Sequence, residues 1–196
     1  MDLLFPTIVH DIKVSSFNEV QDDLIKFSYQ QKKKDPKGVI KSNIGGWQSA
    51  GEYMVSEDNI LQDLIISSVS TYFCDTKLFK KEIKVKIKSL WININGKNDY
   101  NQLHTHPNSD LSGVFWIKTP KDCGKLELRS PGSHYQHQEL MSYTDSISES
   151  LLFHSAYSYP AVAGLIRLFP SSLDHQVYPN KSNQDRISAS FNVGLY

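Results

Sequence analysis

The sequence has little of several features that define whole classes of protein. Its 196 residues include two cysteines, Cys74 and Cys123, which match neither a disulfide framework nor the paired spacing of a zinc site. No apolar run approaches the roughly 20 residues that a membrane-spanning helix needs. Basic and acidic residues both number 21, so the formal net charge is zero and bulk attraction to nucleic acid or membrane surfaces is not expected.

The amino-terminal stretch is also informative for what it lacks. Residues 1–11 carry acids and have no basic region ahead of an apolar core, so they do not form a signal peptide. With so few cysteines and no membrane segment, we expect a cytoplasmic protein.

The spacing of apolar residues changes along the chain. Helices are predicted over residues 16–33, where Ser16-Phe-Asn-Glu19 has capping-box spacing, and over residues 58–73. From Ile83 the period becomes two, because apolar residues alternate with lysines, which is typical of a half-buried strand. Further strands are predicted at Gly113–Lys118, Lys125–Arg129, Leu165–Phe169 and Arg186–Val193.

These elements predict one domain over residues 1–196, with a helix-rich part over 1–82 and a β core over 83–196. Helices first and short strands after them indicate an α+β chain, mainly β, with an antiparallel sandwich or barrel in its second part. The polar, tyrosine-rich stretch 133–159 is interpreted as a hairpin with a long loop that covers a site.

The candidate site is centred on the segment Asn101-Gln-Leu-His104-Thr-His106-Pro. Two histidines one residue apart on a strand point their imidazoles the same way, and His175 offers a third ligand from a distant strand. A mononuclear iron oxygenase needs three protein ligands on one face of an octahedron. Three imidazoles are the favoured set, although Asp110 can supply a carboxylate instead. Zinc would bind three histidines equally well, so the identity of the metal depends on other residues.

Arg186 is the residue that favours iron. Arg186, Ser188 and Ser190 alternate with apolar residues, so the three polar side chains share one strand face. A guanidinium binds a carboxylate in bidentate fashion, and a neighbouring serine hydroxyl adds another hydrogen bond. An isolated arginine on a strand is more often one half of an ion pair. Its position shortly after His175 instead favours an anchor for an acidic co-substrate.

As a set, these motifs resemble the 2-oxoglutarate and Fe(II)-dependent dioxygenases, and more closely a branch of such proteins from tailed phages and some bacteria. The departure from the better-known relatives is His106, which stands at the position of their acid. The resemblance is carried by the segments Gly45–Ser49, Trp91–Asn93, His104–Pro107, Ser112–Trp116, Phe169–Val177 and Arg186–Asn192.

The resemblance implies a double-stranded β-helix, or jelly roll, with the amino-terminal helices packed on one sheet. It implies Fe(II) among His104, His106 and His175. It also implies that Arg186, assisted by Ser188, binds the distal carboxylate of 2-oxoglutarate. Trp91 and Asn93, on the strand before the ligand pair, are implied to contact this co-substrate as well.

The activity implied by the resemblance is that of a hydroxylase. With O2, it would couple decarboxylation of 2-oxoglutarate to oxidation of an unidentified substrate. A phage-encoded enzyme of this kind would act in the host cytoplasm.

Two other functions remain open. A non-catalytic jelly-roll binding or virion-associated protein would keep the shell and a metal site, because fold alone does not determine function. The full set of three histidines and Arg186 argues for an enzyme, since a binding protein has no need of it. A cupin-like three-histidine dioxygenase would not need 2-oxoglutarate, and the pair Arg186 and Ser188 argues against it.

Overall fold

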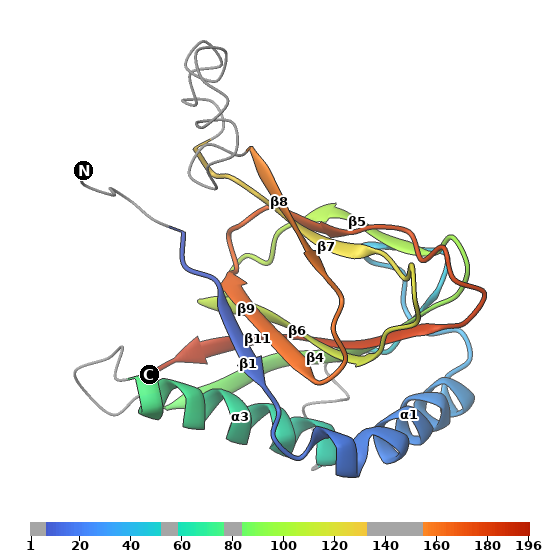
Figure 1. Cartoon of the computed structure of the whole chain (residues 1–196), viewed down its shortest axis with the longest axis horizontal. Coiled ribbons are helices and arrows are strands. Elements are labelled where there is room, and N and C mark those ends of the chain that lie inside the picture. The colour runs from blue at the N-terminus through green and yellow to red at the C-terminus, as the bar shows by residue number, and fades with distance from the viewer. Residues whose placement is uncertain (1–6, 52–58, 77–83, 133–154) are drawn as a thin grey trace.

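The computed structural model describes residues 7–51, 59–76, 84–132 and 155–196, and within them two antiparallel sheets are stacked as layers (Figure 1). The larger sheet contains, in spatial order, β1 (His10–Lys13), β9 (Leu165–Pro170), β6 (Leu111–Lys118), β11 (Arg186–Leu195), β4 (Val85–Asn95) and β3 (Trp47–Gln48). The smaller sheet contains β2 (Asn43–Ile44), β5 (Tyr100–His104), β10 (His175–Val177), β7 (Lys125–Arg129) and β8 (Ala156–Pro160).

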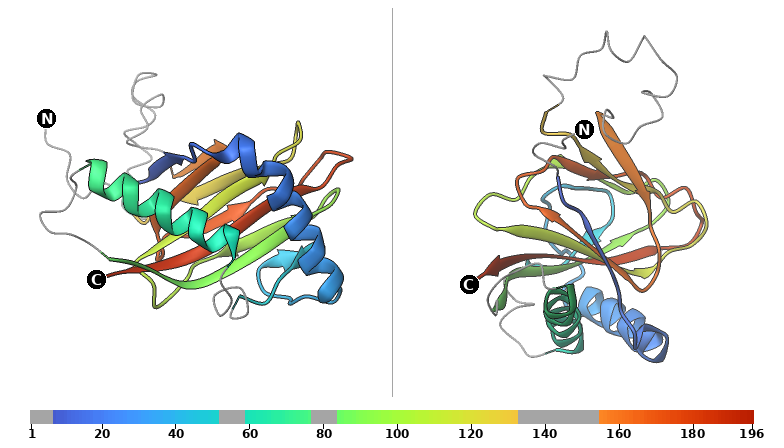
Figure 2. Two further views of the ribbon diagram at one scale, coloured as in Figure 1. Left: turned by 90° about the horizontal axis from the view of Figure 1, so that it is seen from below. Right: turned by 60° about the vertical axis from the view of Figure 1, so that its left-hand side comes forward.

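Two helices, α1 (Phe17–Lys34) and α3 (Ile60–Thr76), cover the outer face of the larger sheet, as both views in Figure 2 show. They bury apolar side chains against that sheet in one continuous core, which confirms the predicted helices packed on one sheet. The contribution of α3 is one buried residue per turn, from Leu61, Ile65, Val69 and Phe73.

The start of α1 corrects one detail of the sequence interpretation. Ser16 is the N-cap residue, but its side chain makes no capping hydrogen bond, so the predicted capping box does not form. The backbone oxygen of Ser16 instead accepts a hydrogen bond from the Glu19 amide at 3.1 Å. At the other end, the Asp35 amide donates to the Gln31 carbonyl, close to the predicted end of the helix.

β11 is the central strand of the larger sheet and separates two different environments. Its residues Ile187, Ala189, Phe191 and Val193 are fully buried in the core beneath the helices. The residues between them point the other way, into the space between the two sheets, because side chains alternate along a strand. That second set is polar and consists of Arg186, Ser188, Ser190 and Asn192.

Gly45 and Gly46 let the chain pass from one sheet to the other between β2 and β3. Both have positive φ, 64° and 58°, a conformation that residues with a side chain rarely adopt. A Cβ on Gly45 would lie 2.0 Å from Oδ1 of Asp99, so this turn also needs the space that glycine leaves. The segment that follows the turn therefore returns to the edge of the larger sheet beside β4.

The long strands were predictable and several short ones were not. β7 has the predicted bounds, and β6, β9 and β11 extend the predictions by one or two residues. The strands β1, β2 and β3 were missed, and all three come from the first 82 residues yet join the sheets. The predicted loop ends in β8, which pairs with β7 as a hairpin, while residues 133–154 lie outside the described residues.

No helix in the described part of the chain is both long enough and apolar enough to cross a membrane.

Candidate active site

The three predicted histidines come together on the smaller sheet. His175 of β10 pairs directly with His104 of β5. His106 lies just beyond the end of β5, where its amide donates to the Ser171 carbonyl at 2.9 Å. Each imidazole offers one nitrogen, and these nitrogens all lie within 4.8 Å of one another. Strand pairing therefore creates the cluster from residues that are far apart in sequence.

Two of the histidines are fixed in one tautomer by the backbone. His104 donates Nδ1–H to the Gln102 carbonyl at 2.7 Å, and His175 donates Nδ1–H to the Leu173 carbonyl at 2.8 Å. A carbonyl oxygen only accepts, so the proton must lie on Nδ1 and the lone pair on Nε2. Such backbone contacts are the usual way in which proteins orient metal-binding imidazoles.

Burial keeps all three imidazoles neutral, which is the state that binds a metal. Burial lowers the pKa of His104, although its hydrogen bond to Gln102 opposes the change. The pKa of His106 is lowered to about 4 by burial and by the neighbouring His104. The pKa of His175 is lowered to about 3, chiefly by burial.

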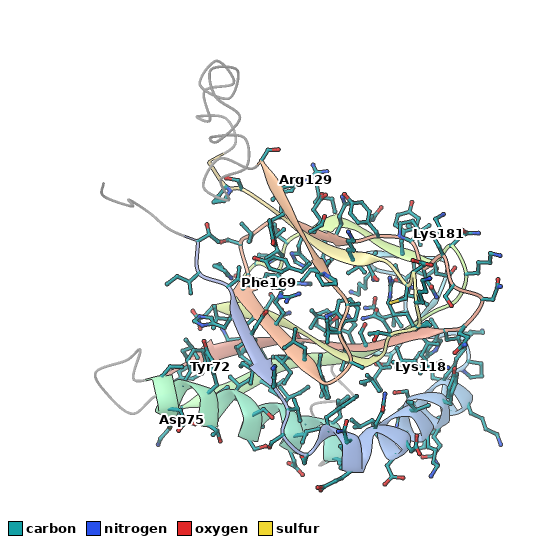
Figure 3. All side chains as sticks on the ribbon, viewed as in Figure 1. Tyr72, Asp75, Lys118, Arg129, Phe169 and Lys181 are labelled. Atoms are coloured by element: carbon teal, nitrogen blue, oxygen red, sulfur yellow. The ribbon has the colours of Figure 1, made fainter. Side chains whose placement is uncertain are left out.

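Aromatic rings hold the cluster on two sides. The indole of Trp91 meets the His106 ring edge-on at 5.3 Å between centroids. Phe169 points from β9 into the space between the sheets, where its ring lies 4.7 Å from that of His175 (Figure 3). These contacts fix the imidazole planes and exclude solvent from their flanks.

Arg186 is fully buried at the start of β11. Its Nη1 donates to the carbonyls of Tyr178, at 2.9 Å, and Cys123. Its Nε and Nη2 are buried without a hydrogen-bond partner. Burial lowers its pKa to about 10, so the guanidinium remains charged at neutral pH. A buried cation with one unpaired edge provides the bidentate donor pair that a carboxylate fits.

The polar residues around Arg186 line the same interior. Asn95 pairs with Arg186 across β4 and β11, and Asn93 pairs with Ser188. The Oδ1 atoms of Asn93 and Asn95 are buried and unpartnered, like the two nitrogens of Arg186. The structure thus brings Asn93 and Ser188 onto the face predicted from sequence. It adds Asn95, which the strand period places on that face but which no motif marked.

Asp110, the alternative carboxylate ligand, is outside the histidine cluster. It is exposed, and its Oδ2 accepts a hydrogen bond from the Leu195 amide at 2.9 Å. The only group of three or more metal-ligating side chains found among the described residues is His104, His106 and His175.

A pocket of about 660 Å³ opens beside the histidines. His104, His106 and Trp91 line it, together with several residues from the segment between Val39 and Gly51. Its volume is within the range of small-molecule sites. Trp47, which lies in this segment, packs into the core and donates Nε1–H to the Asp35 carbonyl.

The residues present fit an iron ion and a carboxylate-bearing ligand. Three neutral, oriented imidazoles leave the other coordination positions of an octahedral metal open. The interior next to them holds a buried cation with an unpaired edge.

Comparison with known proteins gives a family match over this part of the chain. A family model described as "Putative 2OG-Fe(II) oxygenase" matches residues 89–192, which is more than half of the chain and includes all three histidines and Arg186. No curated protein sequence matches significantly.

Solved structures share the fold at low sequence identity. The non-heme alpha ketoglutarate dependent carbocyclase SnoK from nogalamycin biosynthesis superposes with a TM-score of 0.66 at 12% identity, over 94% of this chain and 78% of that one. The viral collagen prolyl hydroxylase of Paramecium Bursaria Chlorella virus-1, in complex with 2OG, gives 0.57 at 15% identity, over 94% of both chains. HygX from Streptomyces hygroscopicus, with iron bound, gives 0.59 at 9% identity, over 96% of this chain and 82% of that one. These likenesses confirm the predicted jelly roll.

Proposed function

The chain belongs to the 2OG-Fe(II) oxygenase family, and on this premise we propose that His104, His106 and His175 hold the iron while Arg186 anchors 2-oxoglutarate. The observation that carries the proposal is the unpaired edge of the buried Arg186, in the same interior that the three imidazoles border. A buried cation with two unpartnered nitrogens destabilises the folded state, so its presence is best explained by an acidic ligand that pairs with it.

The histidines contribute a site that is ready before the metal arrives. Nε2 of His104 and of His175 is directed by backbone carbonyls, so little side-chain freedom is lost on binding. When bound, the iron supplies the redox chemistry that couples decarboxylation of 2-oxoglutarate to oxidation of the substrate by O2.

Arg186 contributes position and charge. Its Nε and Nη2 would donate to the two oxygens of the distal carboxylate, and Ser188, two residues along the same face, would add a hydroxyl donor. Because the guanidinium is shielded from water, its attraction to a carboxylate is stronger than at a protein surface. The co-substrate would thus be held at a fixed depth relative to the histidines.

The substrate would reach the site through the pocket beside His104 and His106. Its volume suits a small molecule or one side chain of a larger partner. Hydroxylation is the proposed outcome, supported by the family and by neighbours that are prolyl hydroxylases, although others are a carbocyclase and an epimerase.

Anaerobic titration with Fe(II) and then 2-oxoglutarate tests the proposal directly. The chelated co-substrate should give a visible charge-transfer band in the wild type. Arg186→Ala should bind Fe(II) normally but need much more 2-oxoglutarate to develop the band. His175→Ala should fail at the metal step.

The matched control is Arg167→Ala. Arg167 is also buried, but its charge is already paired with Asp11 through two hydrogen bonds of 2.7 and 2.8 Å. Its loss should affect folding more than co-substrate binding. A wild type that binds iron without a 2-oxoglutarate band would reject the Arg186 assignment. Absence of iron binding would favour the jelly-roll binding protein.

A further inference from the structure

Trp116 carries an unmet hydrogen-bond donor inside the molecule. It lies on β6 and is fully buried, yet its indole Nε1–H has no partner. An indole nitrogen can only donate, and a buried donor left unpaired costs about 1–3 kcal/mol. Trp47 shows the usual arrangement, because its Nε1–H is satisfied by the Asp35 carbonyl at 2.8 Å.

Strand register places Trp116 between the histidines and Arg186. Trp116 pairs with Ser188 of β11, and Ser188 pairs with Asn93 of β4, so the three form one row across adjacent strands. All three face the interior, since Trp116 packs with residues such as Phe169 that lie between the sheets. Arg186 is two residues further along β11, on the same face.

The next row along these strands, in the direction away from Arg186, lies toward the metal site. It contains Trp91 paired with Ser190, and the ring of Trp91 contacts His106. Successive rows on one face are about 6.6 Å apart, since each residue of a strand adds about 3.3 Å. A linear five-carbon diacid that reaches from the histidines to Arg186 must therefore pass the row of Trp116.

We infer that Trp116 donates its indole N–H to the carboxylate of 2-oxoglutarate that Arg186 binds, and so helps select a diacid over a monoacid. The inference rests on the proposed function. A carboxylate has about four acceptor positions, so it can take two hydrogen bonds from the guanidinium edge and a third from the indole. Asn93 has an unpartnered Oδ1 in the same row, which could in principle accept from the Trp116 indole N–H. However, β4 is two strands away from β6, at about 9.6 Å between strand axes, so Asn93 does not replace the carboxylate as its partner.

Calorimetric titration of the Ni(II)-loaded protein tests this role without turnover. The ligands are 2-oxoglutarate and 2-oxopentanoate, which has the same keto acid end but no distal carboxylate. Trp116→Phe should weaken 2-oxoglutarate binding by about 10- to 100-fold, the range for a hydrogen bond to a charged group. Its affinities for 2-oxopentanoate and for Ni(II) should stay within about twofold of wild type, because neither contacts the indole nitrogen.

Two further variants separate the hydrogen bond from packing. Trp116→Tyr has the ring of Trp116→Phe plus a hydroxyl donor, so it should recover part of the 2-oxoglutarate affinity. Trp47→Phe removes a buried indole whose N–H is already bonded, so it should leave both ligand affinities unchanged. Equal weakening of both keto acids in Trp116→Phe, or no weakening of 2-oxoglutarate, would overturn the inference.

An NMR measurement on the wild type does not depend on the variants folding. The chain has three tryptophans and thus three indole N–H signals, which Trp47→Phe and Trp91→Phe assign by elimination. In the diamagnetic Zn(II)-loaded protein, the Trp116 signal should move downfield with 2-oxoglutarate and much less with 2-oxopentanoate. If the chemical shift of the Trp116 indole N–H stays unchanged while calorimetry shows that 2-oxoglutarate binds, the Trp116 role is overturned and the proposed function still holds. No 2-oxoglutarate binding by the metal-loaded wild type would instead reject the proposed function itself.

Discussion

The two faces of the larger sheet obey different rules although the same strands build them. On the face beneath α1 and α3, β4 and β11 present apolar side chains that are almost wholly buried. On the face toward the smaller sheet, the same strands present asparagines, serines and Arg186, and most of these are buried as well. Burial alone therefore does not distinguish the scaffold from the site in this molecule. The two differ in whether their buried polar atoms have hydrogen-bond partners.

Among the described strand residues, none on the helix face has a buried unpartnered polar atom, whereas several on the inner face do. Apolar side chains need only close packing, which the helices supply. The described part of the inner face contains six buried unpartnered polar atoms, from Gln48, Asn93, Asn95, Trp116 and two nitrogens of Arg186. Such groups are destabilising as they stand and become favourable only with a partner. The first face therefore stabilises the fold, whereas the second lowers the stability of the ligand-free protein and provides hydrogen-bond donors and acceptors for a ligand.

Phe191→Ala should break the helix face and cause the largest loss of stability. Phe191 is fully buried in the core under the helices, and truncation of such a ring costs about 3–5 kcal/mol. Urea unfolding followed by circular dichroism measures the change. The fraction that remains folded should bind Fe(II) with wild-type affinity, because Phe191 points away from the histidines. A selective loss of iron affinity in folded protein would contradict this separation of the two faces.

His175→Ala should have the opposite effect, because it removes a proposed metal ligand of the smaller sheet and leaves the core beneath the helices intact. Iron affinity should fall by at least about 100-fold, since residues that merely orient a ligand already change metal affinity 10- to 100-fold. Equilibrium dialysis against Fe(II) under argon measures it. The apoprotein should lose much less stability than Phe191→Ala, because the imidazole makes one backbone hydrogen bond, to Leu173. Retained iron binding would show that another ligand completes the site.

Arg186→Met should affect stability and binding in different ways, because it should weaken 2-oxoglutarate binding without destabilising the ligand-free protein. The apoprotein should be as stable as wild type or more stable by about 1–3 kcal/mol, because removing a buried charge that has no acidic partner and two unpartnered nitrogens offsets the loss of the Nη1 hydrogen bonds. Affinity for 2-oxoglutarate should fall by about 30-fold or more, corresponding to about 2 kcal/mol or more for a buried charged contact. Thermal unfolding of the apoprotein and calorimetry of the Ni(II) form give the two values. A destabilised apoprotein would mean that Arg186 serves the fold.

His106→Asp should change the charge of the metal site while leaving both faces of the larger sheet unaltered. Three imidazoles leave the iron one unit more positive than a site with a carboxylate ligand, which favours a dianionic co-substrate. We expect His106→Asp to bind 2-oxoglutarate about three- to tenfold more weakly, within the range of a single coupling between nearby groups. The charge-transfer titration measures the change. Equal or tighter binding by the variant would remove the reason offered for the third histidine.

What the sequence could predict follows from the same two faces. The alternation in residues 186–193 was readable, and with His104, His106 and His175 it led to the polar face and its arginine. Trp116 was not readable as a binding residue, because a tryptophan in an apolar strand is normally core. Only the missing partner of its N–H marks it.

Short strands were unpredictable for a different reason. β2 and β3 have two residues each, too few to show a period, and they exist because Gly45 and Gly46 turn the chain between sheets. β10 has three residues and is defined by its pairing with β5 and β7 rather than by its own composition. Tertiary pairing fixes such elements, so local pattern carries little information about them.

Asp110→Asn should have the smallest effect on metal and co-substrate binding, because Asp110 lies outside the histidine cluster. Asp110 is the nearest carboxylate in sequence to the ligand pair, which made it the alternative ligand considered from the sequence. Its Oδ2 is instead occupied by the Leu195 amide, which holds the end of β11, and an asparagine oxygen can accept the same bond. Iron and 2-oxoglutarate affinities should therefore stay within about twofold of wild type, and stability should fall by no more than about 1 kcal/mol. A loss of iron affinity comparable to that of His175→Ala would mean that Asp110 joins the metal site when iron binds, and the three-imidazole set would have to be abandoned.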